Sequence, residues 1–326
     1  MIVCSQEKRI DTAFPVITHK NIWKDVSIIL KMKELNLVMA VNQQYLPICE
    51  TMLFSFFRYH KEYHVTLYLL NRVLNDNEIY RLEEFLKSFK AELFVISVDK
   101  EYFAEMPTVS NRFSEEIYYR ILAHELIPRT VRKALWIDAD IICMGSISEL
   151  YEMDLKGNLM AVGRDFACES SAISKIKKSM GIMPEHAYFN SGVLLMDLEK
   201  IRREFTRDII VELMNRYSNV LIYPDQDILN RMYQGKVTYF NEKVYNYQVN
   251  STWDLKGSVG EIKLLHYTGY RKPWIPKYAR PVCRYYWQVC LQQKKYFACA
   301  KFTVLYLLWG LPKRVNRLKE QFGDKK

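Results

Sequence analysis

Residues 37–41 read Leu-Val-Met-Ala-Val, an apolar run that ends in the polar sequence Asn42-Gln43-Gln44. Such a run is typical of a buried strand that leads into a loop. The elements expected next alternate in type: a helix at 46–59, a strand at 65–70, a helix at 78–89 and a strand at 93–98. Strands that alternate with helices predict βαβ units, so we expect an α/β fold whose Rossmann-like sheet is mainly parallel and flanked by helices.

The rest of the chain extends this pattern. The later elements that we expect are a helix at 115–126, strands at 134–137, 159–162 and 192–196, a helix at 225–233, and a strand at 262–265 that leads into His266. Residues 1–35 are weakly patterned and predict an appendage of helix and loop. We therefore divide the chain into this appendage, a main domain at 36–275 and a basic helical tail at 276–326.

Composition excludes several classes of protein. The chain has 326 residues, of which 49% are hydrophobic and 26% are charged, so it is neither disordered nor collagen-like. Its seven cysteines form no C-x-x-C pair, which favours a reducing cytosol over a disulfide framework or a zinc site. We see no apolar run of about 18 residues and no secretory signal, and we expect a cytoplasmic protein.

The excess positive charge is concentrated in the tail. The formal net charge is +10, and residues 271–326 contain 14 Lys and Arg but only 2 Asp and Glu. Aromatic residues are interspersed among these cations, as suits an anionic lipid surface. We expect peripheral contact with the inner face of the plasma membrane. The alternatives are a basic helical hairpin packed on the main domain and a nucleic-acid patch, and we expect no nucleic-acid partner.

Two carboxylates follow the strand expected at 134–137. Asp138 and Asp140 are two positions apart, so in extended chain their side chains project to the same side. Hard divalent cations such as Mg²⁺ and Mn²⁺ prefer oxygen ligands, commonly one or two carboxylates together with substrate phosphates. A D-x-D sequence alone is more often a solvated strand end.

A second polar cluster closes the main domain. His266 ends a strand and is followed by Gly269, Lys272 and Trp274 in the pattern H-x-x-G-x-x-K-P-W. Imidazole is a suitable ligand for Mn²⁺, glycine lets the backbone approach a phosphate, and lysine provides a positive charge for it. A lone histidine is more often structural.

Two further motifs lie between these clusters. Residues 188–195 read Tyr-Phe-Asn-Ser-Gly-Val-Leu-Leu, and residues 223–230 read Tyr-Pro-Asp-Gln-Asp-Ile-Leu-Asn. Each alone is as typical of a helix cap or loop. Together and in this order, the four motifs resemble glycosyltransferase family 8, especially its bacterial retaining sugar transferases. The similarity extends from about Leu37 to Trp274.

This resemblance implies a GT-A fold for residues 36–275, a nucleotide-sugar donor, usually UDP-linked, and Mn²⁺ or Mg²⁺ as cofactor. Matched by position, the metal ligands are Asp138, Asp140 and His266. The residues implied at the donor's phosphates and sugar are Arg120, Asp165, Asn190, Gly269 and Lys272. Ala40, Asn42 and Tyr45 fall where the first strand meets the uridine, and Asp225 and Gln226 fall beside the anomeric carbon.

The implied reaction is transfer of galactose or glucose, with retention, from a UDP-sugar to a hydroxyl of a glycan or glycolipid acceptor. An amide is a poor nucleophile, so we favour same-face attack with Gln226 stabilising the sugar cation. Asp225 is the candidate if a carboxylate nucleophile acts. The chain also departs from the family, which has acidic residues where Asn42 and Gln43 stand, and this bears on base preference.

Three rival hypotheses remain open at this point. A nucleotidyltransferase also combines paired carboxylates with a metal and a nucleotide, although the motifs at 223–230 and 266–274 argue against it. A non-catalytic sugar-nucleotide-binding or membrane scaffold with a dead site is the second, although intact Asp138, Asp140, His266 and Lys272 argue against it. Self-glycosylation is the third.

Overall fold

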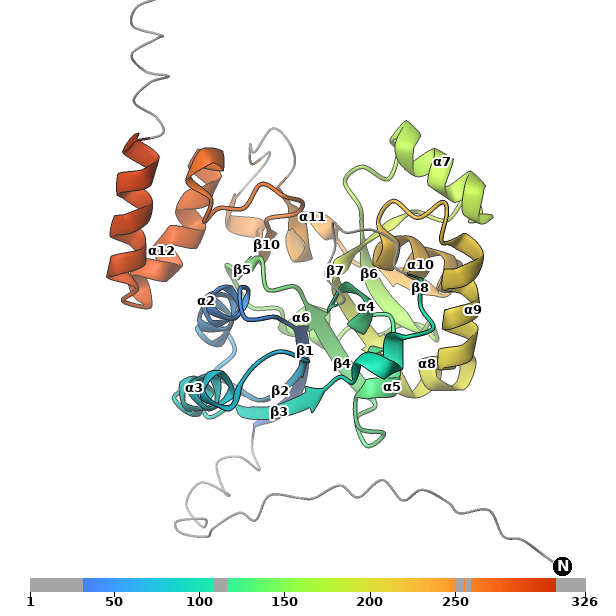
Figure 1. Ribbon diagram of the computed structural model, residues 1–326, viewed down its shortest axis with the longest axis horizontal. Coiled ribbons are helices and arrows are strands. Elements are labelled where there is room, and N and C mark those ends of the chain that lie inside the picture. Colours follow the sequence, from blue (N-terminus) through green and yellow to red (C-terminus); the bar gives the residue numbers. More distant parts are fainter. Residues whose placement is uncertain (1–31, 108–115, 250–254, 256–258, 309–326) are drawn as a thin grey trace, which may run out of the picture.

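The computed structural model describes residues 32–107, 116–249, 255 and 259–308. Its centre is a seven-stranded sheet in the order β3-β2-β1-β4-β7-β6-β8 (Figure 1). The strands are β1 (Lys33–Ala40), β2 (Tyr63–Asn71), β3 (Glu92–Ser97), β4 (Lys133–Ile137), β6 (Met160–Arg164), β7 (Phe189–Asp197) and β8 (Val237–Tyr239). Strand β7 is antiparallel to β4 and β6, and the other described pairs of this sheet are parallel.

A second, three-stranded sheet has the order β5-β10-β9, with β5 at Ile141–Cys143, β9 at Tyr247–Gln248 and β10 at Leu264–His266. The helices are α2 (Leu46–Phe57), α3 (Asp76–Lys87), α4 (Glu116–Tyr119), α5 (Ala123–Leu126), α6 (Ser148–Tyr151), α7 (Ser171–Met180), α8 (Leu198–Glu204), α9 (Arg207–Tyr217), α10 (Pro224–Met232), α11 (Glu242–Tyr245) and α12 (Arg284–Gln292). Residues 296–308 are also helical.

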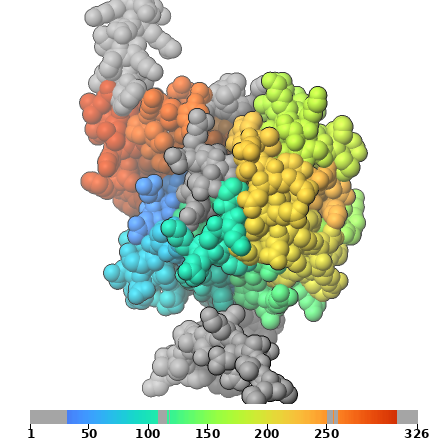
Figure 2. Space-filling model, turned by 45° about the vertical axis from the view of Figure 1, so that its right-hand side comes forward, coloured from blue at the N-terminus to red at the C-terminus, as the bar shows by residue number. Residues whose placement is uncertain are grey.

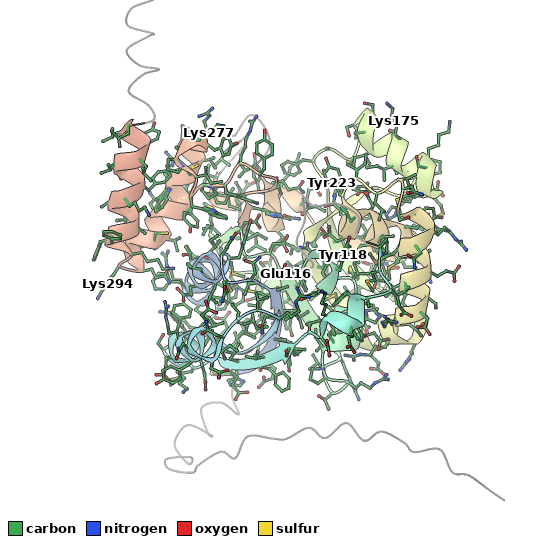
Figure 3. The ribbon with its side chains drawn as sticks, in the orientation of Figure 1. Glu116, Tyr118, Lys175, Tyr223, Lys277 and Lys294 are labelled. Atoms are coloured by element: carbon green, nitrogen blue, oxygen red, sulfur yellow. The ribbon has the colours of Figure 1, made fainter. Side chains whose placement is uncertain are left out.

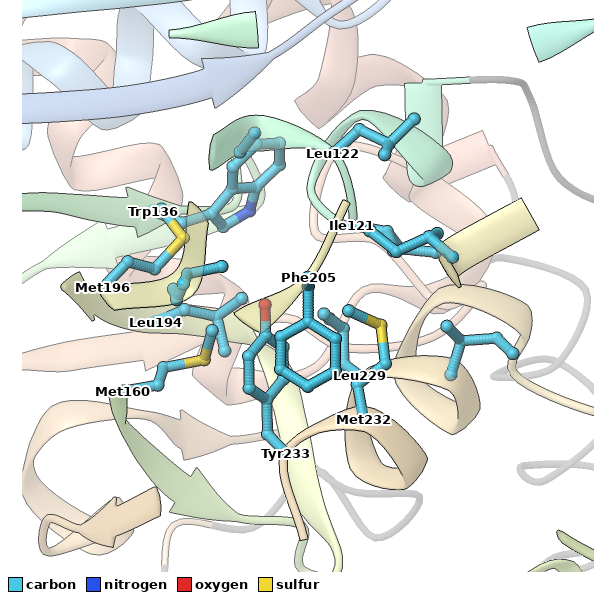
Figure 4. Packing of buried hydrophobic residues seen from close by; sticks show 14 of the residues in the cluster. Ile121, Leu122, Trp136, Met160, Leu194, Met196, Phe205, Leu229, Met232 and Tyr233 are labelled. Carbon is cyan, nitrogen blue, oxygen red and sulfur yellow. The ribbon is translucent and has the colours of Figure 1, made fainter. Parts of the chain in front are cut away.

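Helices cover both faces of the large sheet because its strands are apolar on both sides. Along β1, Leu37 and Met39 belong to a core cluster shared with α2 and α3, whereas Val38 belongs to the opposite cluster. In that opposite cluster, residues of α10 pack against strands β6 and β7. Figure 4 shows Phe205 over Tyr233, with ring centroids 5.2 Å apart. The large sheet thus packs between two layers of helices.

Local sequence explains where several elements begin. Pro47 lies in the first turn of α2, where its missing N–H has no helical partner to lose. Helix α3 opens with a capping box, in which the Asn75 side chain accepts from the Glu78 N–H and the Glu78 carboxylate accepts from the Asn75 N–H. The chain therefore turns into a helix directly after β1 and after β2.

The structure corrects three expected elements. The single helix expected at 115–126 is wrong: α4 and α5 are separate, because Arg120 leaves the helical path to pair with two carboxylates. Strand β7 begins at Phe189 rather than at Gly192. Strand β1 begins at Lys33, within the expected appendage, because Lys33 pairs in register with Tyr63. Residues 1–31 of that appendage lie outside the described part of the chain.

The tail forms a helical hairpin, α12 followed by residues 296–308, beside α2 (Figure 1). Figure 2 shows it in orange and red next to the blue surface of α2. Val282, Cys283 and Tyr286 are buried in a separate core cluster, together with residues of β9 and β10. Among the described residues, no helix has both the length and the apolar character needed to cross a membrane.

Arg202 in α8 forms hydrogen bonds to α5 and to the loop before β4. The Arg202 guanidinium donates to the carbonyls of His124 (2.6 Å), Ile127 (3.0 Å) and Val131 (2.9 Å). These carbonyls need donors at the end of α5 and in the loop behind it. By contrast, the adjacent Arg203 is exposed and pairs only with Glu199 among the contacts described.

We therefore predict that Arg202→Met lowers the free energy of unfolding by about 3 kcal/mol, because it leaves several partly buried carbonyls without a donor. The matched variant Arg203→Met should change it by less than about 0.5 kcal/mol, as expected of an exposed ion pair. Urea denaturation followed by circular dichroism measures both. Equal effects of the two substitutions would contradict this account.

Candidate active site

Three segments that are distant in sequence meet where β4 ends beside β7 in the large sheet. The chain leaves β4 at Asp138, whose N–H donates to the Gly192 carbonyl in β7 (2.9 Å). It then enters β5 of the small sheet, which pairs with β10, and Tyr267 donates to the Asp140 carbonyl (3.0 Å). Crossing from one sheet to the other therefore fixes both aspartates between β7 and the end of β10.

Asp138, Asp140 and His266 form a group that could hold a metal ion. One ligand atom from each lies within 4.8 Å of the others. The His266 Nε2 atom is 3.2 Å from Asp140 Oδ1 and 3.9 Å from Asp138 Oδ2. The side chains of Asp138 and Asp140 are only 20% and 12% exposed, so the cluster is largely shielded from water.

Gly192 makes room for His266. A Cβ atom at this position would lie 2.2 Å from His266 Cε1, a distance at which one of the two must move. Glycine is therefore required in β7 by the close approach of the imidazole rather than by an unusual backbone angle. The other ring nitrogen, Nδ1, is 2.8 Å from Asn246 Oδ1.

Arg120 balances two of the carboxylates. It pairs with Asp138 (Nη2–Oδ1, 3.0 Å) and with Asp225 (Nε–Oδ2, 3.0 Å), and it donates to the Ser191 carbonyl (2.9 Å). Its guanidinium also lies 5.1 Å from the ring of Trp136. Although burial opposes the charged form, the two carboxylates outweigh it and raise the pKa of Arg120.

Lys272 neutralises the other aspartate. Its ammonium contacts Asp140 and donates to the Tyr267 carbonyl (2.8 Å). Burial favours the neutral carboxyl, but Lys272 and His266 overcome it and hold the pKa of Asp140 far below its usual value. For Asp138, burial prevails over the stabilising charge of Arg120, so its pKa is raised.

The donor set fits a divalent cation. The Asp140 Oδ1 atom is buried without a hydrogen-bond donor, although buried polar atoms normally have one. It faces the His266 Nε2 atom 3.2 Å away. Two carboxylate oxygens and an imidazole nitrogen directed at one point are ligands that suit Mn²⁺ or Mg²⁺.

A polar network adjoins this cluster. Gln226, in the first turn of α10, donates to Asp165 Oδ2 (3.1 Å) and accepts from Asn190 Nδ2 (3.0 Å). Asp225 accepts from the Ser191 hydroxyl (3.0 Å). Gln226 thus connects Asp165 and Asn190, two side chains expected around the donor sugar.

The expected uridine residues lie at the end of β1. Ala40 ends the strand, and the Asn42 side chain accepts from the Tyr45 N–H (3.1 Å), which forms the turn into α2. The Tyr45 ring packs edge-on against Trp274 with centroids 5.9 Å apart. Gly269 has φ +72°, a conformation that favours glycine, in the loop that leads to Lys272.

Aromatic contacts link this region to the tail. Trp274 packs against Tyr286, and Tyr286 packs against Trp287, with centroids 5.4 and 5.3 Å apart. The Trp287 indole N–H donates to the carbonyl of Pro273, next to Lys272 (3.0 Å). Helix α12 therefore supports the loop that carries Lys272.

Sequence reasoning missed three residues of this region. Ser191 lies inside the motif at 188–195 but was assigned no role. Asp227, fully buried, accepts from the N–H groups of Ile222 and Tyr223 and thereby shapes the start of α10. Asn246 follows α11 in a stretch without a motif, so no sequence signal pointed to it.

Comparisons with known proteins define the class. The sequence model described as Glycosyl transferase family 8 matches residues 36–277, about three quarters of the chain. The protein is an enzyme of the hexosyltransferase class, and it belongs to glycosyltransferase family 8.

Characterised relatives match most of this chain and most of their own length. A lipopolysaccharide 1,2-glucosyltransferase of Escherichia coli K12 is 26% identical over 264 residues, which cover 77% of this chain and 76% of the relative. A lipopolysaccharide 1,3-galactosyltransferase of Salmonella typhimurium is 24% identical over 263 residues, with coverage of 78% and 77%.

Among solved structures, the galactosyltransferase LgtC in complex with donor and acceptor sugar analogues has a TM-score of 0.69 at 24% identity. The match covers 79% of this chain and 96% of that one. This likeness confirms the expected GT-A fold, with its mainly parallel central sheet and C-terminal helices.

Proposed function

We propose that this enzyme transfers galactose or glucose, with retention, from a UDP-sugar to a hydroxyl of a lipopolysaccharide-type glycan or glycolipid. The observation that carries the proposal is the convergence of Asp138, Asp140 and His266 beside the two cations Arg120 and Lys272. The activities of the two relatives, a lipopolysaccharide glucosyltransferase and a lipopolysaccharide galactosyltransferase, support the sugar class and the acceptor class.

Asp138, Asp140 and His266 would hold Mn²⁺ or Mg²⁺, with the donor's diphosphate as the remaining ligand. The ion would supply Lewis-acid stabilisation of the charge that develops on UDP as it leaves. Lys272 is placed to contribute a second positive charge, because its ammonium already lies against Asp140. Gly269 lets the same loop approach the phosphates closely.

Around the sugar, we assign binding and orientation to Asp165 and Asn190, and electrostatic support to Arg120. The Gln226 amide oxygen already accepts from Asn190 Nδ2 and from the Ser191 N–H (3.1 Å), which occupies its two lone pairs. Asp225 is likewise held by Arg120 and Ser191. This arrangement favours same-face attack by the acceptor hydroxyl over a nucleophilic side chain.

The metal proposal is tested by UDP release. With UDP-galactose or UDP-glucose, the wild-type enzyme should release UDP slowly by hydrolysis and faster with acceptor, and only when Mn²⁺ or Mg²⁺ is present. Asp138→Asn should reduce this release by at least about 100-fold, because a charged ligand is lost and Arg120 loses one of its two carboxylate partners.

The matched control is Asp154→Asn, an exposed aspartate outside the four site motifs, which should retain full activity. Formation of pyrophosphate instead of UDP would indicate a nucleotidyltransferase. A mass increase of the enzyme itself by one hexose would indicate self-glycosylation. Unchanged UDP release by Asp138→Asn would refute the metal assignment.

We further propose that the hairpin contacts an anionic membrane surface on its cytoplasmic side. Phe297, Val304 and Leu308 are 84%, 55% and 59% exposed and share one side of the last helix by their spacing. Lys294 lies at the turn of the hairpin, as Figure 3 shows, and Lys301 is also exposed. Apolar side chains beside cations are typical of interfacial helices.

Replacing Phe297 and Leu308 by serine should weaken binding to anionic phosphatidylglycerol vesicles by about tenfold or more, because both apolar side chains leave the interface. Point variants are preferable to truncation, since α12 contributes buried residues to the core. Tyr80→Ser in α3, which is 60% exposed, is the control and should float with the vesicles like wild type. Equal flotation of all three proteins would leave the hairpin with a structural role only.

A further inference from the structure

A continuous chain of side-chain hydrogen bonds runs from Asp165 to His266. Gln226 bridges Asp165 and Asn190, as described above. Asn190 Oδ1 then accepts from Asn246 Nδ2 (2.9 Å), and Asn246 Oδ1 lies 2.8 Å from His266 Nδ1. The side chain of Asn246 therefore connects the expected sugar-binding residues to the candidate metal ligand.

The direction of every bond in this chain is fixed by groups that cannot change roles. The Ser191 N–H donates to Gln226 Oε1, and the Gly192 N–H donates to Asn190 Oδ1 (3.0 Å). Backbone N–H groups are donors only, so both amide oxygens must be acceptors. Asn246 must then donate through Nδ2 to Asn190, which leaves its Oδ1 as an acceptor for His266.

This direction decides where the imidazole carries its proton. If Asn246 Oδ1 accepts, His266 Nδ1 must bear a hydrogen, and in the neutral ring Nε2 is left with a lone pair. The Nε2 atom is the one that faces Asp140 and Asp138. The network thus selects the tautomer that can bind a cation.

We propose that Asn246 is a positioning residue that holds His266 in its metal-binding tautomer and joins that ligand to the sugar-binding network. The inference rests on the metal site of the proposed function. Asn246 is completely buried and, in the described contacts, its side chain bridges only Asn190 and His266. Partners of metal-bound histidines orient the ring and raise its basicity.

Two substitutions distinguish the roles of the two hydrogen bonds made by the Asn246 side chain. Asn246→Leu removes both hydrogen bonds, and we expect it to weaken Mn²⁺ binding by about 10- to 100-fold, measured by calorimetry with UDP present. Asn246→Asp keeps an acceptor for His266 but loses the donor to Asn190. We expect it to keep Mn²⁺ affinity within about threefold while the KM for the UDP-sugar rises about tenfold.

Asn230→Leu is the matched control. Asn230 is also a completely buried amide in the same region, but it bonds to the backbone of Phe189 and Gln226 rather than to His266. It should lose stability in urea as Asn246→Leu does, yet bind Mn²⁺ like wild type. Equal loss of Mn²⁺ affinity in both leucine variants would overturn the proposal, because it would indicate general loosening of the site.

A spectroscopic measurement without metal keeps the inference testable if the leucine variant fails to fold. Long-range ¹H–¹⁵N correlation of wild-type protein should show a proton on His266 Nδ1. A proton on Nε2 alone would overturn the proposal. Absence of Mn²⁺ binding by wild type, with the proton on Nδ1, would instead refute the proposed function and leave the hydrogen-bond direction intact.

Discussion

The structure depends on keeping three carboxylates together in a nearly dry space. Asp138 and Asp140 belong to one cluster, and Arg120 pairs with both Asp138 and Asp225. Like charges about 4 Å apart at an effective dielectric of about 20 repel by about 4 kcal/mol. Arg120 offsets this repulsion at Asp138 and Asp225, and Lys272 offsets it at Asp140. Asp140 Oδ1 nevertheless remains without a donor, so the cluster is neutralised only in part and stays ready for a cation.

This requirement explains features that look unrelated in sequence. The break between α4 and α5 lets Arg120 turn inward, and the crossing from β4 to β5 carries the two aspartates from one sheet to the other. Gly192 leaves space for His266. The tail contributes through Trp287, which holds the backbone beside Lys272. Segments that are far apart in the described chain therefore contribute to the candidate site.

Much of the fold could be predicted, since apolar runs that alternate with helical spacing determine βαβ order directly. The D-x-D pair and His266 could likewise be predicted, because the pair follows an apolar strand and His266 ends one. Arg120 was assigned to the middle of a helix, because its tertiary ion pairs override the local helical pattern. The role of Asn246 could not be predicted from the sequence, because it depends on contacts with Asn190 and His266, and no local pattern encodes such distant contacts.

The claim that the aspartates and His266 form one metal site can be tested by crystallography. We would soak crystals with Mn²⁺ and UDP and collect data at a wavelength where manganese scatters anomalously. The account predicts one strong peak about 2.0–2.3 Å from oxygens of Asp138 and Asp140 and from His266 Nε2. A peak at another position, or one bound through His266 Nδ1, would contradict it.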